Sequence, residues 1–329
     1  MKKQIVGSII ERSFCAVQTF LSILLETVMS AVLLIFPILF IMGCNTSVPE
    51  FSGESAFHYL EKQCSFGPRN PGSEGHENCK EFLINTMAEF ADTAFTQMFN
   101  QSIPGTSDTL VMTNIISIFT GTGTGSLLLG AHWDTRPTAD HDMNPELRNQ
   151  PILGANDGAS GVAVLLETAR ILSQHSHDET IYIVFFDAED SGIEGEPHSY
   201  ALGAQYFAKN LPIPLPDYAI VLDMVGDADL HLPIERNSYV QNPTLVKYLW
   251  TLADELGLNA FEKQIQYEIY DDHVPLWEEA QIPAIDIIDF NYPNKYSNFW
   301  HTHEDIPDHC SAESLNQIGI LLIHYIYGR

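Results

Sequence analysis

The stretch GSLLLGAHWD, residues 125–134, decides the fold class of this chain. Its apolar run shows no alternation with polar residues, and it ends in the polar residues His132 and Asp134. An unbroken apolar run of this length is typical of a strand that is buried on both faces of a parallel sheet. We therefore expect a central strand that delivers polar side chains to a loop at its C-terminal end.

Strand-like runs of the same kind alternate with helical patterns along the chain. We predict buried strands in ETIYIVFFDAED, DYAIVLDMVGD and IPAIDIIDF, and helices in NDGASGVAVLLETARILSQ, YALGAQYFAKNL, NPTLVKYLWTLADELG and AESLNQIGILLIHYIYG. Upstream, helices are expected at 55–64 and about 74–90, followed by two edge strands in DTAFTQMFNQSI and TNIISIFTG. This alternation predicts an α/β fold with a mostly parallel, twisted central sheet and helices on both faces.

The first 43 residues are predicted to be a signal peptide of the lipoprotein type. MKK supplies positive charge, and the apolar run 29–44 ends in Gly43-Cys44. The apolar segment is shorter than a transmembrane helix requires. The pattern resembles a bacterial lipoprotein signal, in which the cysteine is lipidated and becomes the new N-terminus. An uncleaved anchor and a misassigned start codon are the alternatives.

The remainder of the chain is expected to hold a linker at 44–54 and one folded domain at 55–329, because no repeat or break in composition divides it. Its net charge of −28, from 15 basic and 43 acidic residues, would repel phosphate backbones, so nucleic-acid binding is not expected. Anionic lipid is repelled as well. We expect an exported protein, in the periplasm or cell envelope, that meets a membrane only through a signal anchor or a lipid on Cys44.

Side chains that bind metals occur at the ends of the predicted strands and in adjacent loops. They are His132 and Asp134 in GAHWD, Asp157 in GANDGASG, Glu189 and Asp190 in FFDAED, Asp223 in VLDMVGD, and His301 in FWHTH. In open α/β sheets, ligands bind beyond the carboxyl ends of the strands, where residues distant in sequence converge. Carboxylates and imidazoles suit zinc, and the absence of Cys-x-x-Cys argues against a thiolate site.

Most of these residues also have an ordinary structural explanation. Asp157 can cap the helix that it begins, the adjacent acids Glu189 and Asp190 can lie in a solvated loop, and His132 alone is typical of a satisfied core histidine. Asp223 is different, because burying an unpaired carboxylate in an apolar strand costs on the order of several kcal/mol. Since the whole set falls on one predicted edge of the sheet, we favour a metal site.

Several longer motifs resemble a known family. FGPRNPGS, GAHWDTRP, GANDGASGVAVLLETAR, FFDAEDSG, DDHVPLWEEAQIPAIDII and FWHTHEDIPD resemble, in matching order, the glutaminyl-peptide cyclotransferases (glutaminyl cyclases) and, more broadly, their zinc-aminopeptidase-like fold. The Glu189-Asp190 pair resembles bacterial members more than animal ones. Residues 191–199 lack a tryptophan of the animal enzymes, and Tyr200 is the candidate substitute in the pocket wall.

The resemblance implies a metal-ligand set. Asp157, Asp190 and His301 match three zinc ligands, and one zinc per chain is expected. His132 and Asp223 match the pair that holds a second metal in the related aminopeptidases.

The resemblance also implies the remaining site residues. Glu189 matches the general acid/base, and Asp271 matches a carboxylate that hydrogen-bonds within the active site. Trp300 matches a tryptophan that lines the substrate pocket. His303 matches no ligand and is expected to be a polar loop residue near the pocket rim.

The implied activity is zinc-dependent cyclisation of the N-terminal glutamine of peptides or proteins to pyroglutamate, with release of ammonia. The zinc-dependent catalytic domain then spans 55–329. The first alternative is a two-zinc aminopeptidase that releases N-terminal residues, since every ligand it needs is present. A less favoured alternative is a catalytically inactive, ligand-binding lipoprotein, against which an intact Glu189 and a complete ligand set both argue.

The signal assignment makes a direct prediction about the mature protein. We expect mass spectrometry of protein isolated from its native host to find no peptide upstream of Cys44, because signal removal leaves that cysteine at the N-terminus. Recovery of peptides from residues 1–43 in the mature protein would contradict the assignment.

Overall fold

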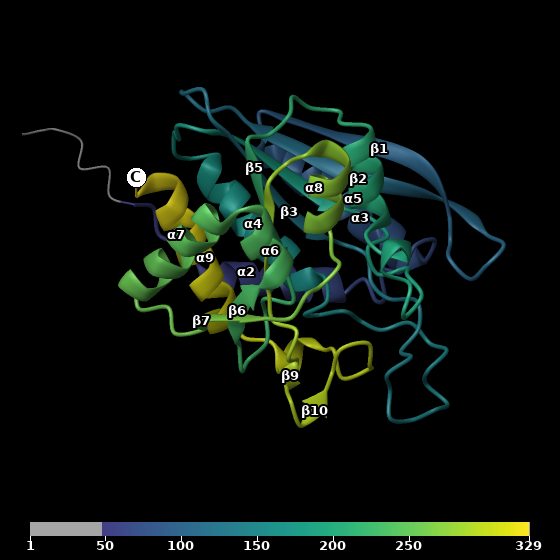
Figure 1. The fold of residues 1–329 in the computed structure, drawn as a ribbon. Helices are drawn as coiled ribbons and strands as arrows, with labels where there is room; N and C mark the ends of the chain where they lie inside the picture. Colours follow the sequence, from purple (N-terminus) through teal and green to yellow (C-terminus); the bar gives the residue numbers. More distant parts are fainter. Residues whose placement is uncertain (1–47, 329) are drawn as a thin grey trace, which may run out of the picture. The chain divides into compact units, whose positions relative to one another are not determined.

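A sheet in the strand order β1-β2-β4-β3-β5-β8 organises residues 48–328, the part of the chain that this computed structural model describes (Figure 1). The strands are β1 (Thr93–Ser102), β2 (Thr109–Phe119), β3 (Ser126–His132), β4 (Thr180–Phe186), β5 (Tyr218–Asp223) and β8 (Ala284–Ile288). The neighbours from β4 to β8 are parallel, whereas β1 and β2 pair antiparallel, as do β2 and β4. This confirms the predicted α/β class with a mostly parallel sheet.

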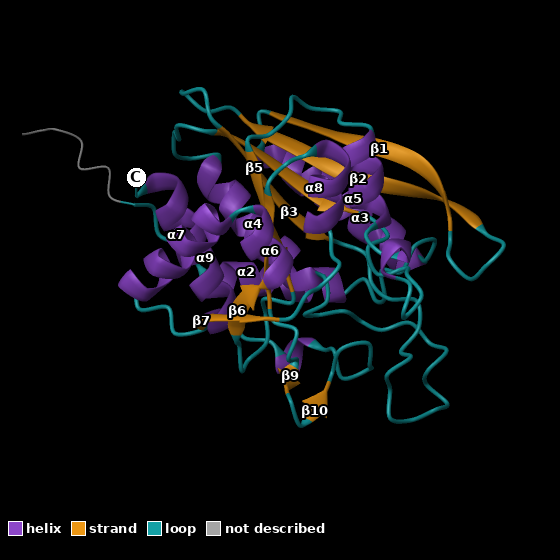
Figure 2. Cartoon of the chain, viewed as in Figure 1, coloured by secondary structure: helices purple, strands orange, loops and turns teal. Residues whose placement is uncertain are grey.

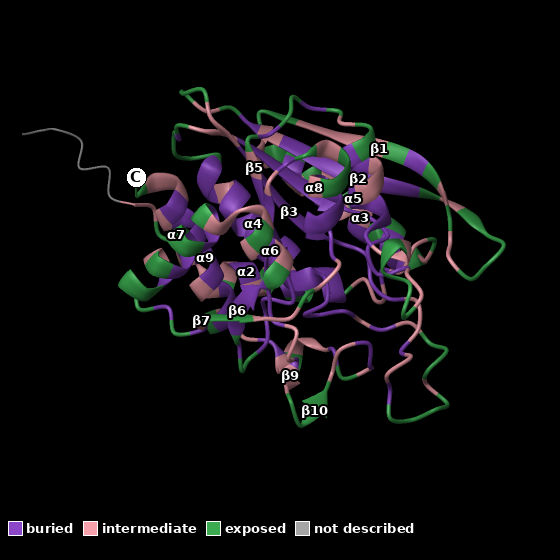
Figure 3. Cartoon of the chain, in the orientation of Figure 1, coloured by how far each residue is buried: buried purple, intermediate pink, exposed green. Residues whose placement is uncertain are grey.

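Helices cover both faces of this sheet (Figure 2). One face packs against α2 (Gly53–Cys64), α3 (Glu74–Phe90), α4 (Ala159–Leu172), α7 (Pro243–Glu255) and α9 (Ala312–Tyr327); the other packs against α5 (Leu202–Lys209) and α8 (His273–Ala280). Within β3, Leu127 and Leu129 join the first core and Leu128 joins the second. Because successive strand residues point to opposite faces, an unbroken apolar run fills both cores. Figure 3 shows the central strands β3 and β5 as buried, whereas the edge strand β1 is mostly intermediate or exposed.

Short elements between β5 and β8 were not predicted from the sequence. They are β6 (Leu232–Glu235), α6 (Arg236–Gln241), β7 (Phe261–Gln266) and α8, while β9 (Pro293–Asn294) and β10 (Ser297–Asn298) form a small ribbon near the C-terminus. β6 and β7 make a separate two-stranded parallel sheet. Segments of four to eight residues carry too few positions for a hydrophobic period to stand out.

The folded part begins earlier than residue 55, where the catalytic domain was predicted to start. Helix α2 begins at Gly53, and the hydroxyl of Ser52 caps it by accepting the backbone N–H of Ser55. Phe51 is buried against α9, where a Cβ on Gly319 would overlap its ring. The predicted signal peptide, residues 1–43, and the lipidated Cys44 lie outside the described residues.

Within the described residues, the cysteines Cys64, Cys79 and Cys310 are buried and free. Among residues 48–328, no helix has the length and apolar character needed to cross a membrane.

The packing of Phe51 predicts that residues upstream of 55 stabilise the domain. We expect Phe51→Ala to lower the free energy of unfolding by about 3–5 kcal/mol, because it removes a buried ring that a neighbouring glycine leaves room for. Urea denaturation measures this, with Tyr296→Ala as the control, since the Tyr296 side chain is 85% exposed. A Phe51→Ala variant as stable as that control would show that these residues are not part of the folded domain.

Candidate functional site

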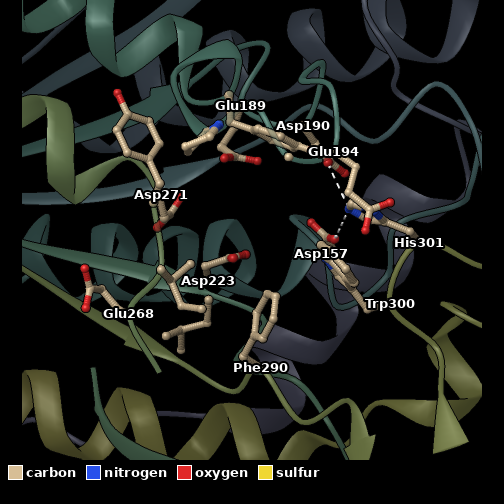
Figure 4. Close-up of a pocket in the computed structure, with 16 residues that line it drawn as sticks. Asp157, Glu189, Asp190, Glu194, Asp223, Glu268, Asp271, Phe290, Trp300 and His301 are labelled. Carbon is tan, nitrogen blue, oxygen red and sulfur yellow. Dashed lines mark ion pairs between the residues drawn. The ribbon is translucent and has the colours of Figure 1, made fainter. Parts of the chain in front are cut away.

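A pocket of about 370 Å³ opens beyond the C-terminal ends of the parallel strands (Figure 4). Acidic side chains and rings line it: Asp157, Glu189, Asp190, Asp223, Asp271, Tyr200, Tyr270, Phe290, Trp300 and His301. Glu189 and Asp190 follow β4, Asp223 ends β5, and Phe290 follows β8. The predicted convergence of strand ends on one edge of the sheet is therefore what the fold produces.

Asp157, Asp190 and His301 form a compact, buried group. The Nε2 atom of His301 lies 3.1 Å from Asp190 Oδ1 and 3.8 Å from Asp157 Oδ2. One potential ligand atom from each residue lies within 4.8 Å of the others. These three side chains, which come from three separate loops, can therefore bind one metal ion together.

A second buried group shares Asp157 with the first. His132 Nε2 lies 3.2 Å from Asp157 Oδ1 and 3.1 Å from Asp223 Oδ1. The close approach requires Gly158 beside Asp157, because a Cβ at that position would overlap the imidazole of His132. Asp157 thus directs one carboxylate oxygen towards each group, and the geometry can accept either one or two metal ions.

Three residues in left-handed backbone conformations lie at or beside the site. His301 itself has φ = 57°, Ala188 before Glu189 has φ = 58°, and Met224 after Asp223 has φ = 46°. Such conformations are costly for non-glycine residues and concentrate where a side chain must be directed. Here they turn the chain sharply at strand ends, so that the site residues face the pocket.

Asp134 and Asp305 hold the ligand loops rather than line the pocket. Asp134 accepts the backbone N–H groups of Glu189 and Asp190 at 2.9 and 3.3 Å. Asp305 accepts the backbone N–H of Asn156 at 2.7 Å and that of Asp157 at 3.2 Å. From the sequence, Asp134 is among the side chains that could bind a metal. In the structure, Asp134 instead holds the backbone of a ligand loop.

Arg136 is a buried cation beside the first group. Its guanidinium donates to the backbone oxygen of Asp190 at 3.1 Å and to Asp190 Oδ1 at 3.3 Å, and it pairs with Asp140 at 2.7 Å. Arg136 and Asp305 were not singled out from the sequence, although both lie inside motifs that carry ligands, GAHWDTRP and FWHTHEDIPD. A buried arginine or aspartate within such a motif is the signal that could have identified them.

The electrostatics of the ligand groups fit a metal ion. Burial, together with the nearby Arg136 guanidinium, lowers the pKa of His301 to about 3, so the imidazole is neutral and offers a lone pair. Burial raises the pKa of Asp190 to about 7 and that of Asp223 to about 7, against opposing cationic neighbours. Asp190 Oδ2 and His301 Nδ1 are buried and have no hydrogen-bond partner. A cation would stabilise this concentration of negative charge.

Glu189 and Asp271 point into the same pocket from adjoining sides (Figure 4). Burial raises the pKa of Glu189 well above its ordinary range, and the carboxylates of Asp271 and Asp190 contribute, while His132 opposes them. Burial also raises the pKa of Asp271, against the opposing influence of His273. Neither carboxylate oxygen of Asp271 has a hydrogen-bond partner, so this group is available to a bound molecule.

An aromatic wall lies beside the carboxylates. Trp300 stacks on the imidazole of His301 with 3.7 Å between ring centroids, and it contacts Phe290 at 5.0 Å. Tyr200 lines the pocket, as expected, and the guanidinium of Arg136 lies over its ring at 5.5 Å. The wall places apolar surface directly next to the candidate metal position.

His303 lies apart from both ligand groups. Its Nδ1 contacts Asp142 Oδ2 at 3.0 Å, and its backbone N–H donates to the same oxygen at 3.2 Å. The residue is not part of the pocket lining. The two histidines of the WHTH segment therefore have different environments.

Known proteins resemble this chain in both sequence and fold. The family model for peptidase family M28 matches residues 114–326. The crystal structure of Porphyromonas gingivalis glutaminyl cyclase is 37% identical, with a TM-score of 0.80 over 84% of this chain and 97% of that one. A Zn-dependent exopeptidase from Parabacteroides distasonis is 35% identical, with a TM-score of 0.82 over 86% of this chain and 100% of that one.

Curated relatives give a similar picture over shorter spans. Aminopeptidase YwaD of Bacillus subtilis is 31% identical over 182 residues, which are 53% of this chain and 37% of that protein. The match covers less than two thirds of the length of the first curated relatives, including a glutaminyl-peptide cyclotransferase of which it covers 63%.

The separation of the two histidines generates a prediction about metal binding. We expect His301→Ala to lose bound zinc, because it removes one of three clustered ligands, and the matched variant His303→Ala to retain it. Elemental analysis of gel-filtered protein gives the zinc content of each variant. Full zinc content in His301→Ala, or a comparable loss in His303→Ala, would contradict the assignment.

Proposed function

The chain belongs to peptidase family M28, and on this premise we propose that it is a zinc-dependent glutaminyl cyclase. The substrate is a peptide or protein with N-terminal glutamine. Its α-amine attacks the side-chain carbonyl carbon, a carbon–nitrogen bond closes the five-membered lactam, and the bond to the amide nitrogen breaks to release ammonia. The likeness to the Porphyromonas gingivalis glutaminyl cyclase supports this activity.

The observation that carries the proposal is the pair of buried carboxylates, Glu189 and Asp271, in one pocket beside the ligand group. Cyclisation needs one group that moves a proton from the attacking amine to the leaving nitrogen. It also needs a hydrogen-bond acceptor that orients the side-chain amide of the substrate while the amide nitrogen becomes ammonia. The two carboxylates can supply these functions without the positioned water that hydrolysis requires.

Asp157, Asp190 and His301 are the residues that hold the zinc, with one ion per chain in the cyclase. Three protein ligands with an open fourth position are the usual arrangement at catalytic zinc. Bound zinc supplies a Lewis acid that polarises the side-chain carbonyl and stabilises negative charge on its oxygen. Asp305 accepts hydrogen bonds from the backbone N–H groups of Asn156 and Asp157, which holds the ligand Asp157 in place.

Glu189 accepts the proton of the attacking amine and returns it to the leaving nitrogen. Its raised pKa suits this function, because a carboxyl group that titrates closer to neutral pH both takes and gives a proton readily. Asp271 accepts a hydrogen bond from the amide nitrogen. The carboxylate of Asp271 contributes to the raised pKa of Glu189, and this interaction favours the sharing of a proton between the two acids.

Trp300 and Phe290 form the apolar side of the pocket. The aliphatic part of the glutamine side chain packs against these rings, and the packing excludes water from the reacting carbonyl. Exclusion of water favours the internal amine over hydrolysis.

A second candidate function follows from the group His132, Asp157 and Asp223. A metal ion held there, with Asp157 shared, would give the two-metal site of an aminopeptidase, in which Glu189 activates water. The likeness to aminopeptidase YwaD supports this alternative. Two tightly bound zinc ions per chain would favour the aminopeptidase over the cyclase.

The place of action is part of the same proposal. Export and a lipid on Cys44 would present the pocket to peptides outside the cytoplasm, and that lipid or a signal anchor would be the only attachment to a membrane. Residues 1–44, on which this depends, lie outside the described part of the chain.

The proton-transfer role makes Glu189→Gln the decisive variant. We expect it to lower ammonia release from a glutaminyl peptide by at least about 10²-fold, because the amide cannot move the proton, while zinc content stays at the wild-type level. A coupled ammonia assay and elemental analysis on the same preparation measure both. Wild-type rates in a folded, zinc-loaded variant would exclude Glu189 as the acid/base.

A further inference from the structure

Asp271 is a buried acid whose fixed position has no explanation in its own contacts. Both of its carboxylate oxygens lack hydrogen-bond partners. An unpaired buried carboxylate is costly unless a neighbouring charge compensates it. The compensation must come from the elements packed behind the pocket wall.

Behind Asp271 lies a fully buried histidine between carboxylates. The Nδ1 atom of His273 is 4.0 Å from Asp271 Oδ2 and 3.9 Å from Asp286 Oδ2, and its Nε2 atom is 3.3 Å from Glu235 Oε2. Both ring nitrogens therefore face carboxyl groups. Neither ring nitrogen makes a hydrogen bond, so these are close electrostatic contacts with three carboxyl groups. A positive charge on this imidazole would compensate the acids around it, Asp271 included.

Glu235 is the rigid end of this arrangement. It ends β6 and caps α6, and its side chain accepts the backbone N–H groups of Asn237, Ser238 and Ile269 at 2.8, 2.6 and 3.1 Å. The Ser238 hydroxyl adds a fourth hydrogen bond at 2.8 Å. Burial alone would raise the pKa of Glu235, but the contact with His273 and these backbone donors lower it to about 2. Glu235 is therefore an ionised, immobile carboxylate.

The same cap holds the loop that carries Asp271. Besides the Ile269 N–H on Glu235, the side-chain amide of Asn237 donates to the Ile269 oxygen at 2.9 Å, and the Arg236 N–H donates to the Tyr267 oxygen at 3.1 Å. Ile269, Tyr270 and Asp271 line the pocket. The start of α6 thus fixes both the backbone that presents Asp271 and the histidine behind it.

We propose that Glu235 and His273 form a buried ion pair that positions Asp271 and stabilises its negative charge, and that they are positioning residues for the cyclisation step. Neither residue lines the pocket, so neither contacts the substrate. Asp286 is the remaining acid beside the imidazole, with its Oδ2 atom 3.9 Å from His273 Nδ1. The proposal rests on the cyclase activity proposed above, in which Asp271 acts on the amide.

A positioning role for the pair predicts a specific kinetic pattern. Because the hydrogen bond from the amide to Asp271 matters most while the amide nitrogen becomes ammonia, loss of the pair should lower kcat by a larger factor than it raises KM. We expect His273→Gln, which can still donate to Glu235 but carries no charge, to lower kcat by roughly 10- to 100-fold. Glu235→Gln should have a similar effect.

The test is a double-mutant cycle in kcat on a glutaminyl peptide, measured on zinc-loaded, folded protein. Because Glu235 acts through His273, the variant that carries both changes should lose no more activity than the more impaired single variant. Glu167→Gln is the matched control. Glu167 is also fully buried and ion-paired, but its partner is Arg170 on α4, outside the pocket, so its loss should lower stability and leave kcat and KM unchanged.

Three results would overturn the proposal: a folded His273→Gln variant with kcat within about twofold of wild type, a rise in KM without a fall in kcat, or losses in kcat that multiply independently. If Glu235→Gln does not fold, the kcat and KM of His273→Gln decide the matter alone. If the wild-type protein releases no ammonia from the peptide, the proposed function fails, and the action of Asp271 on the amide fails with it. Activity in the wild type with unimpaired variants would reject the positioning role only.

Discussion

The main constraint on this structure is the electrostatic cost of burying many carboxylates at one end of a sheet. Asp157, Glu189, Asp190, Asp223 and Asp271 converge there, and all five are less than one tenth exposed. Isolated charges of one sign cannot be buried together without compensation. The protein compensates locally with backbone N–H groups, with Arg136 beside Asp190, and with histidines. The arrangement of the ligand groups leaves space for a cation to supply the rest.

This constraint also explains the layers of support around the pocket. Asp134 and Asp305 are buried and point their oxygens at the backbone of two ligand loops, so that Asp190 and Asp157 are each held by a second carboxylate. Glu235 does the same for the loop of Asp271. The site is therefore a set of acids in the pocket that is held by another set of acids outside it. Function resides in this set rather than in the α/β scaffold, which supports more than one reaction.

The sequence predicted the parts of this arrangement that are local. Apolar runs that end in ligand-type residues identified the sheet and its active edge, because a buried strand places its last polar residues at a common surface. The roles of Asp271 and Trp300 came only from family resemblance, since neither follows a recognisable strand. The pairing of Glu235 with His273 could not be predicted at all. These residues are 38 positions apart, and short elements that carry no clear periodicity bring them together. The number of metal ions per chain could not be predicted either, because Asp157 belongs to both candidate ligand groups.

The most direct test of the central claim is the identity of the product from a peptide with N-terminal glutamine. Mass spectrometry of the reaction should show a peptide that has lost one ammonia while every peptide bond remains intact, and free ammonia should appear in equal amount. That result requires the internal amine to be the nucleophile. Release of free glutamine together with a shortened peptide would contradict the cyclase account and establish that this pocket directs water to the peptide bond instead.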